Sequence, residues 1–221
     1  MKRNQSGFTL IEIAIVLVII GLLLGGVLKG QELINSAKVK NLATDFKNIP
    51  VYIYGYQDKY KALPGDDSLA VTHLGALATP TALPVANIGN GIIDGLWKPA
   101  LVTDETALFW QHVRLANLAA GTTVASTTPP YIPTNAVGGT IGVTSAASSP
   151  IFGMKGSFIV CSDAIAGKFA RQLDTTLDDG VTNSGSVQVV AAGSTAIPAA
   201  ANALLLTPAD DDTPYLVCMG F

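Results

Sequence analysis

The sequence predicts an α+β protein in which a long N-terminal helix packs its second half on an antiparallel β-sheet. Three observations lead to this fold class. An apolar run covers residues 8–28, an amphipathic pattern continues it to about Tyr60, and β-branched runs fill the last third of the chain. At 221 residues, the chain has the length of one globular domain plus an anchor.

The apolar run at residues 8–28 contains a single ionisable side chain, Glu12. About 20 apolar residues are enough for a helix to cross a hydrocarbon layer of ~30 Å. A carboxylate in such a span costs about 2.5 to 3.5 kcal/mol at mid-bilayer, so it is normally paired and functional. The nearest basic side chains are Lys29, several turns further on, and Lys2 and Arg3 before the span. Glu12 therefore needs a cation from elsewhere.

Cleavage of the chain between Gly7 and Phe8 would create this cation. The new α-ammonium of Phe8 would lie about one helical turn from Glu12, or beside the Glu12 of a neighbouring helix. A secretory signal peptide has a shorter apolar core that ends in a small-residue cleavage site, and an ordinary anchor has no use for a carboxylate in its span. We therefore expect a helix that assembles with others.

The N-terminus resembles the class III leader of type IV pilins and of type II secretion pseudopilins. The resemblance rests on Lys2-Arg3, on Gly7-Phe8-Thr9-Leu10-Ile11-Glu12 and on the long apolar helix that follows. It implies that a prepilin peptidase cuts after Gly7 and methylates the amine of Phe8, and that Glu12 helps to dock subunits into a filament. It also implies a type IV pilin-like fold and a single-pass precursor in the inner membrane with its N-terminus in the cytoplasm.

The resemblance implies a structural subunit that polymerises with itself, by means of an inner-membrane pilus or secretion machinery. Its final location would be an extracellular pilus or, as the alternative, a periplasmic pseudopilus. A membrane-anchored exported enzyme is the competing class. The sequence has no G-x-S-x-G elbow, H-E-x-x-H motif or P-loop, so we expect no enzyme. The formal charge of −3 and the lack of a dense basic patch also argue against a nucleic-acid partner.

We expect four segments along the chain. Residues 1–7 form the leader, 8–28 the transmembrane or filament-core helix, 29–62 the amphipathic half of that helix, and 63–221 the globular head. In the third segment, apolar residues recur at steps of three and four: Val39, Leu42, Phe46, Ile49, Ile53, Tyr56 and Tyr60. Pro50 removes one backbone hydrogen bond and is expected to kink the helix.

A turn-rich segment follows the helix and reaches about Trp97. Asn and Asp beside glycines suit tight turns, and they also supply the oxygen ligands that Ca²⁺ prefers. The residues that could bind calcium are Asp66, Asp67, Asn87, Asn90 and Asp94. Their spacing is not that of an EF-hand. Both interpretations, turn chemistry and a calcium site, remain open at this point.

A second helix is expected at residues 103–119, where Thr103, Asp104 and Glu105 supply a capping hydroxyl and acids for the first turn. His112 on this helix is expected at the surface or in packing. The only other histidine is His73, and a zinc site generally needs three or four nitrogen or sulfur ligands.

The segment at residues 121–150 is rich in Thr, Ser, Pro and Gly, and we expect a surface loop with one strand-like piece at 140–143. Strands are expected at 157–160, 186–190 and 215–219, and one or two helical turns at 164–173. A sheet of these strands across the amphipathic half of the long helix would bury both apolar faces. Cys161 and Cys218 are expected to form a disulfide in an oxidising compartment, as in the C-terminal region of many pilins.

Overall fold

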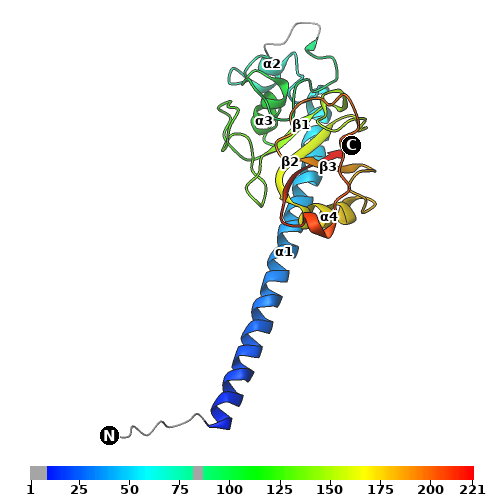
Figure 1. Cartoon of the computed structure of the whole chain (residues 1–221). Helices are drawn as coiled ribbons and strands as arrows, with labels where there is room; N and C mark the ends of the chain where they lie inside the picture. Colours follow the sequence, from blue (N-terminus) through cyan, green and yellow to red (C-terminus); the bar gives the residue numbers. More distant parts are fainter. Residues whose placement is uncertain (1–8, 82–86) are drawn as a thin grey trace, which may run out of the picture. The chain divides into compact units, whose positions relative to one another are not determined.

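The computed structural model describes residues 9–81 and 87–221, and the predicted Gly7 and Phe8 lie outside this part (Figure 1). The fold is α+β and pilin-like, as predicted. The elements are α1 (Leu10–Tyr60), α2 (Ala70–Leu74), α3 (Glu105–Leu115), β1 (Ile141–Thr144), β2 (Ile159–Ala166), α4 (Gly167–Leu177), β3 (Val187–Ala191) and β4 (Pro214–Gly220), with short 3-10 turns at Ala146–Ser148 and Pro208–Asp210. Two compact units, Met1–Lys38 and Val39–Phe221, divide the chain.

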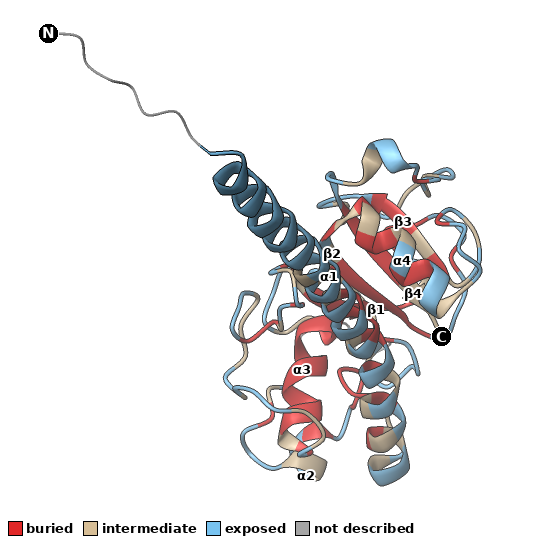
Figure 2. Cartoon of the chain, turned by 90° about the horizontal axis from the view of Figure 1, so that it is seen from below, coloured by how far each residue is buried: buried red, intermediate tan, exposed pale blue. Residues whose placement is uncertain are grey.

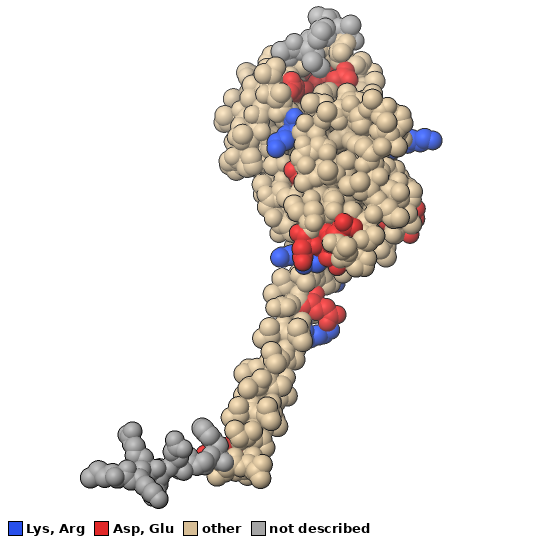
Figure 3. Space-filling view, viewed as in Figure 1, with Lys and Arg blue, Asp and Glu red and all other residues tan. Residues whose placement is uncertain are grey.

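The first unit contains the apolar part of α1, which is exposed along its length. Leu22 is 74% exposed and Leu17 is 64% exposed. Figure 3 shows a surface without charged groups here, because the sequence has no Asp, Glu, Lys or Arg between Glu12 and Lys29. This helix is long and apolar enough to span a membrane.

The second unit begins with the amphipathic part of α1. Its buried residues are Val39, Leu42, Ala43, Phe46, Ile49, Ile53 and Tyr56, which are spaced at helical intervals. The helix continues through Pro50 to Tyr60. Figure 2 shows buried residues gathered on α3 and on the sheet strands. The core cluster joins the buried side of α1 to Phe109 and Val113 of α3.

The four strands form one antiparallel sheet in the order β1-β2-β4-β3. Successive side chains of a strand point to opposite faces. One face joins the core cluster that includes α1 and α4, through Val143, Val160, Val187, Val189 and Val217. The other face packs in a second cluster with Trp97, through Ile159, Cys161, Val190, Leu216 and Cys218. The sheet is therefore buried on both faces.

Cys161 and Cys218 form a disulfide between the two central strands. They stand directly opposite each other in the β2–β4 register, with their Cα atoms 4.1 Å apart. The bond ties the final strand to the middle of the sheet and lies in the cluster around Trp97.

The structure differs from the sequence predictions in the second half of the head. Strand β2 continues to Ala166, because a register shift between Ser162 and Ile165 lets the strand bend and go on pairing with β4. Helix α4 therefore starts three residues later than expected, at Gly167, and runs on to Leu177.

The segment at residues 121–150 is not simply a surface loop. Tyr131 is 1% exposed, and its hydroxyl donates a hydrogen bond to the carbonyl oxygen of Ala107 at 2.6 Å. Strand β1 in this segment is buried throughout. The prediction rested on the average composition of the segment, which is dominated by Thr, Ser and Gly and does not reveal its few buried apolar residues.

Candidate functional site

The start of α1 is held by a reciprocal cap between Thr9 and Glu12. The Oε2 atom of Glu12 accepts hydrogen bonds from the backbone N–H of Thr9 at 2.8 Å and from its hydroxyl at 2.7 Å. The backbone N–H of Glu12 donates to the Thr9 hydroxyl at 3.3 Å. This is the capping-box arrangement, in which a Thr and a Glu three residues later satisfy two backbone donors at a helix start.

The cap occupies only one carboxylate oxygen of Glu12. Among residues 9–81 and 87–221, none donates a hydrogen bond to Oε1. The side chain is exposed in the single chain. In the sequence, the Thr-x-x-Glu pattern already indicates this cap, whereas only a cation was expected to pair with Glu12.

The adjacent acids after α1, Asp66 and Asp67, are both buried but belong to separate networks. The Asp66 carboxylate accepts backbone N–H bonds from Gly89, Asn90 and Gly91. Burial raises the pKa of Asp66, although these three donors oppose the effect. Asp66 therefore fixes the glycine-rich turn to the end of α1.

Asp67 lies in a network of aromatic and imidazole groups. Its Oδ2 accepts a hydrogen bond from the Tyr56 hydroxyl at 2.7 Å and lies 2.7 Å from Nδ1 of His73. Burial would raise the pKa of Asp67, but His73, Tyr56 and the backbone N–H of Leu69 outweigh it and hold the pKa below its usual value. A cavity of about 380 Å³ borders this network.

The other predicted calcium ligands do not complete a site with these acids. Asn90 donates to Asp94 at 3.0 Å and accepts the backbone N–H of Ile92, and Asn87 is exposed. Within the described ranges, Asp66, Asp67 and Asp94 do not bring three carboxylate oxygens within 4.8 Å of one another. Calcium at these five residues stays a prediction, and the contacts observed there are those of turn chemistry.

Glu105, at the start of α3, is fully buried next to this region. Its Oε2 accepts the backbone N–H of Asp94 at 2.7 Å, while Oε1 has no hydrogen-bond partner among the described residues. Burial raises the pKa of Glu105 to about 8, and the charges of Asp66 and Asp94 add to the shift. Glu105 is therefore mostly protonated at neutral pH.

His112 is a packing residue, and it is buried rather than at the surface. Its Nδ1 accepts the backbone N–H of Gly65 at 2.9 Å, and its ring stacks on that of Tyr56. Burial lowers the pKa of His112 to about 4, so the ring is neutral.

The start of α3 also differs from the prediction. Asp104 is the N-cap, and its carboxylate accepts the backbone N–H groups of Ala100 and Leu101.

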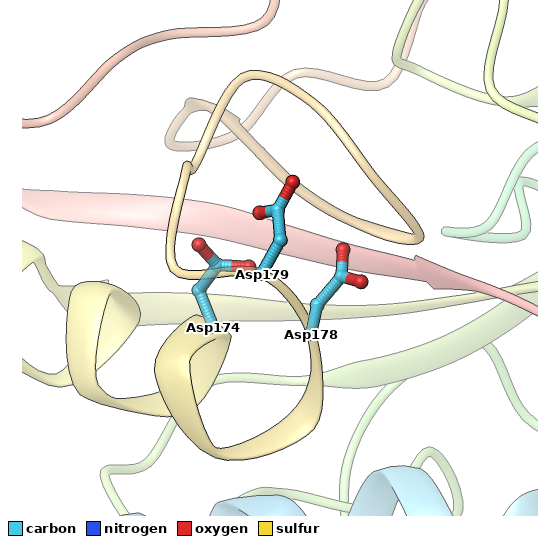
Figure 4. A group of neighbouring side chains, drawn as sticks. All are labelled: Asp174, Asp178 and Asp179. Atoms are coloured by element: carbon cyan, nitrogen blue, oxygen red, sulfur yellow. The ribbon is translucent and has the colours of Figure 1, made fainter.

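A second acidic group, which the sequence analysis did not predict, lies at the C-terminal end of α4 (Figure 4). Asp174, Asp178 and Asp179 can each offer one carboxylate oxygen such that all three lie within 4.8 Å of one another. Asp174 is fully buried, whereas Asp179 is exposed. Burial, followed by the charges of Asp179 and Asp178, raises the pKa of Asp174 to about 7.

A protein-family model matches the N-terminal part of the chain. No curated protein sequence is significantly similar to the chain. The matching family model is described as the prokaryotic N-terminal methylation motif, and such a motif indicates a structural subunit that begins as a membrane-anchored precursor. This model matches residues 2–28, so the chain carries the class III prepilin leader of type IV pilins and pseudopilins.

Proposed function

We propose that the chain is the structural subunit of a type IV pilus-like filament. A prepilin peptidase cuts it after Gly7 and methylates Phe8, and the mature chain polymerises through α1. The observation that carries the proposal is the leader match at residues 2–28, joined to a helix whose apolar surface is open on all sides.

The exposed apolar surface supports assembly in two steps. Lipid covers this surface in the precursor, and neighbouring helices cover it in a filament core. Gly21, Gly25, Gly26 and Gly30 leave room for such neighbours, since a Cβ at any of them would meet no atom within 4 Å. Small residues at these intervals let apolar helices approach closely.

Glu12 supplies the register of the packed helices. One of its carboxylate oxygens caps its own helix, and the other is left for a cation. The methylated ammonium of Phe8, one residue before Thr9, is the cation that processing creates. A charge pair between Glu12 of one subunit and Phe8 of another would be strengthened by the low dielectric of the helix core.

In this proposal residues 1–7 are the leader, 8–28 the filament-core helix, 29–62 its amphipathic half and 63–221 the head. The precursor spans the inner membrane with its N-terminus in the cytoplasm, and an inner-membrane assembly machinery extracts it. The large head, rich in Thr and Ser, favours an extracellular pilus over a periplasmic pseudopilus.

Mechanical shearing of cells tests the proposal. We expect fibres in the sheared fraction, identified by electron microscopy and by peptides of this chain, with an intact mass that starts at a methylated Phe8. Gly7→Leu should leave unprocessed chain in the inner membrane and no fibre. Chain that stays in the membrane with an uncut N-terminus would contradict the proposal, and fibres found only in the periplasm would favour the pseudopilus.

A further inference from the structure

The acidic group at the end of α4 forms where the chain turns from the helix into β3. Asp174 belongs to the last turns of the helix, Asp178 is its C-cap residue, and Asp179 opens the loop to Val187. Figure 4 shows the three side chains on the same side of this turn.

Asp174 is the unusual member of the group. It is 0% exposed, and neither of its carboxylate oxygens has a hydrogen-bond partner among the described residues. The ion pairs found in the described ranges do not include it, although Arg171 and Lys168 on the same helix pair with Asp211 and Asp212. A buried charge without a partner is strongly unfavourable, so such a group is normally paired or bound to a metal.

The dipole of α4 does not stabilise a negative charge at Asp174. The C-terminal end of a helix carries a partial negative charge, which stabilises cations and disfavours carboxylates. Three carboxylates at this end therefore add to a potential that already attracts a positive ion.

The loop holds the other two carboxylates in place. Asp178 Oδ2 accepts the backbone N–H of Val187 at 2.9 Å, and Asp179 Oδ1 accepts that of Val181 at 2.8 Å. The Ser184 hydroxyl donates to Asp179 Oδ2 at 3.2 Å. These bonds orient the two side chains while leaving Asp178 Oδ1 and both oxygens of Asp174 without a donor among the described residues.

We propose that Asp174, Asp178 and Asp179 bind one Ca²⁺ ion, which fastens the C-terminal end of α4 to the loop before β3. The donor set consists of oxygen only, without the His or Cys ligands that zinc and copper prefer. Ca²⁺ binds oxygen at about 2.3 to 2.6 Å, so two ligands of one ion lie at most roughly 4.6 to 5.2 Å apart. The three oxygens of this group lie within 4.8 Å of one another, which is close enough for them to share one ion. Mg²⁺ demands a near-ideal octahedron and gives up water reluctantly, which suits the buried Asp174 poorly.

Thermal unfolding of the full chain in detergent, after removal of metal with EDTA, tests this site. At a hundredfold excess of Ca²⁺ over Kd we expect Tm to rise by roughly 5 to 10 °C. Calorimetric titration with CaCl₂ should give one ion per chain. Mg²⁺ at equal ionic strength should give a clearly smaller shift, and no shift with Ca²⁺, or an equal shift with both ions, would overturn the proposal.

Two variants separate a metal ligand from an acid that is merely structural. Asp179→Asn should lose most of the Tm response to Ca²⁺. Asp174→Asn should raise Tm in EDTA, because it removes a buried charge, and should abolish the response. Asp212→Asn, an exposed acid outside the group, serves as the matched control and should respond like the wild type.

Asp94→Asn tests the alternative location beside Asn90. A response lost in Asp94→Asn but retained in Asp174→Asn and Asp179→Asn would place the ion elsewhere and overturn the proposal. A response retained in Asp94→Asn but lost in Asp174→Asn and Asp179→Asn would support the proposal. None of these measurements depends on filament assembly, so the outcome is independent of the proposed function.

Discussion

Glu12 bonds to Thr9 of its own helix through a single carboxylate oxygen, Oε2, so the carboxylate has two separable roles. One role is to cap the start of α1, which needs only an acceptor at this position. The other is to pair with a cation, which needs the negative charge. Substitutions at the two residues can remove one role and keep the other.

Glu12→Gln should preserve the cap and block assembly. Gln also serves at the N3 position of a capping box, three residues after the N-cap, but it carries no charge to pair with the Phe8 ammonium. We expect the yield of sheared fibre, relative to membrane-held subunit at matched expression, to fall roughly tenfold or more, since a charge pair at low dielectric exceeds the ~1.4 kcal/mol that corresponds to a factor of ten.

Thr9→Val is the matched control, because it removes the capping hydroxyl and keeps the charge. It should cost about 1 kcal/mol of stability at the helix start and change the fibre yield little. Normal fibre from Glu12→Gln together with a large loss in Thr9→Val would mean that Glu12 acts as a cap rather than as a charge.

The disulfide should contribute strongly to the stability of the head. The two cysteines are 57 residues apart, and the chain-entropy model gives about 4 kcal/mol for a loop of this length. Replacement of Cys161 and Cys218 together by Ala should lower the free energy of unfolding by about this amount in urea titrations. Alkylation without reductant should label no thiol in the wild type, and quantitative labelling of both cysteines would contradict the bond.

Gly65 should tolerate no side chain. Its φ is +96°, and a Cβ would lie 2.5 Å from the carbonyl oxygen of Glu105, which is fixed in α3. Gly65→Ala should therefore cost more than the ~1 to 2 kcal/mol of the left-handed conformation alone. Gly138→Ala is the matched control, because Gly138 also has a φ of +91° but an added Cβ would meet no atom within 4 Å. Equal urea midpoints for the two variants would disprove the close approach.

The sequence predicted the parts of the fold that depend on periodicity. The stripe from Val39 to Tyr56 is buried as its spacing requires. The β-branched runs in the last third of the chain form strands of one antiparallel sheet, as predicted. The predicted strand ended at Val160 with its β-branched and aromatic run, whereas β2 continues through the polar residues Ser162 and Asp163 to Ala166. The register shift that allows this cannot be read from composition.

The acidic group at the end of α4 was missed because the predicted helix ended near Leu173. Extended by one turn, the helix brings Asp174 to the same side as Ala170, four residues earlier, which is buried. Periodicity could therefore have indicated a buried carboxylate. The hydrogen bonds that separate Asp66 from Asp67 depend on the folded path of residues 89–91, which no local pattern reveals.

Glu105 should make the head less stable as the pH rises. In the unfolded chain this carboxyl loses its proton near the ordinary pKa of 4.5, whereas in the folded chain it keeps the proton until about pH 8. Between these values the folded state binds more protons than the unfolded state, so this residue lowers stability as pH rises through the window, by at most about 1.4 kcal/mol per pH unit. The loss continues through the folded-state pKa, and the contribution becomes constant about one pH unit above it.

Glu105→Gln isolates this effect, because the amide has nearly the same shape as the protonated acid and does not titrate. Asp174 and Asp45 also have raised pKa values, of about 7 and about 6, so the wild-type curve contains their contributions as well. Urea titrations between about pH 4 and pH 9 give the free energy of unfolding of Glu105→Gln and of the wild type. We expect the variant to become more stable relative to the wild type with each step in pH, and the difference to level off above pH 8. A difference that stays constant with pH would mean that Glu105 is ionised in the folded protein and that its buried oxygen has found a donor.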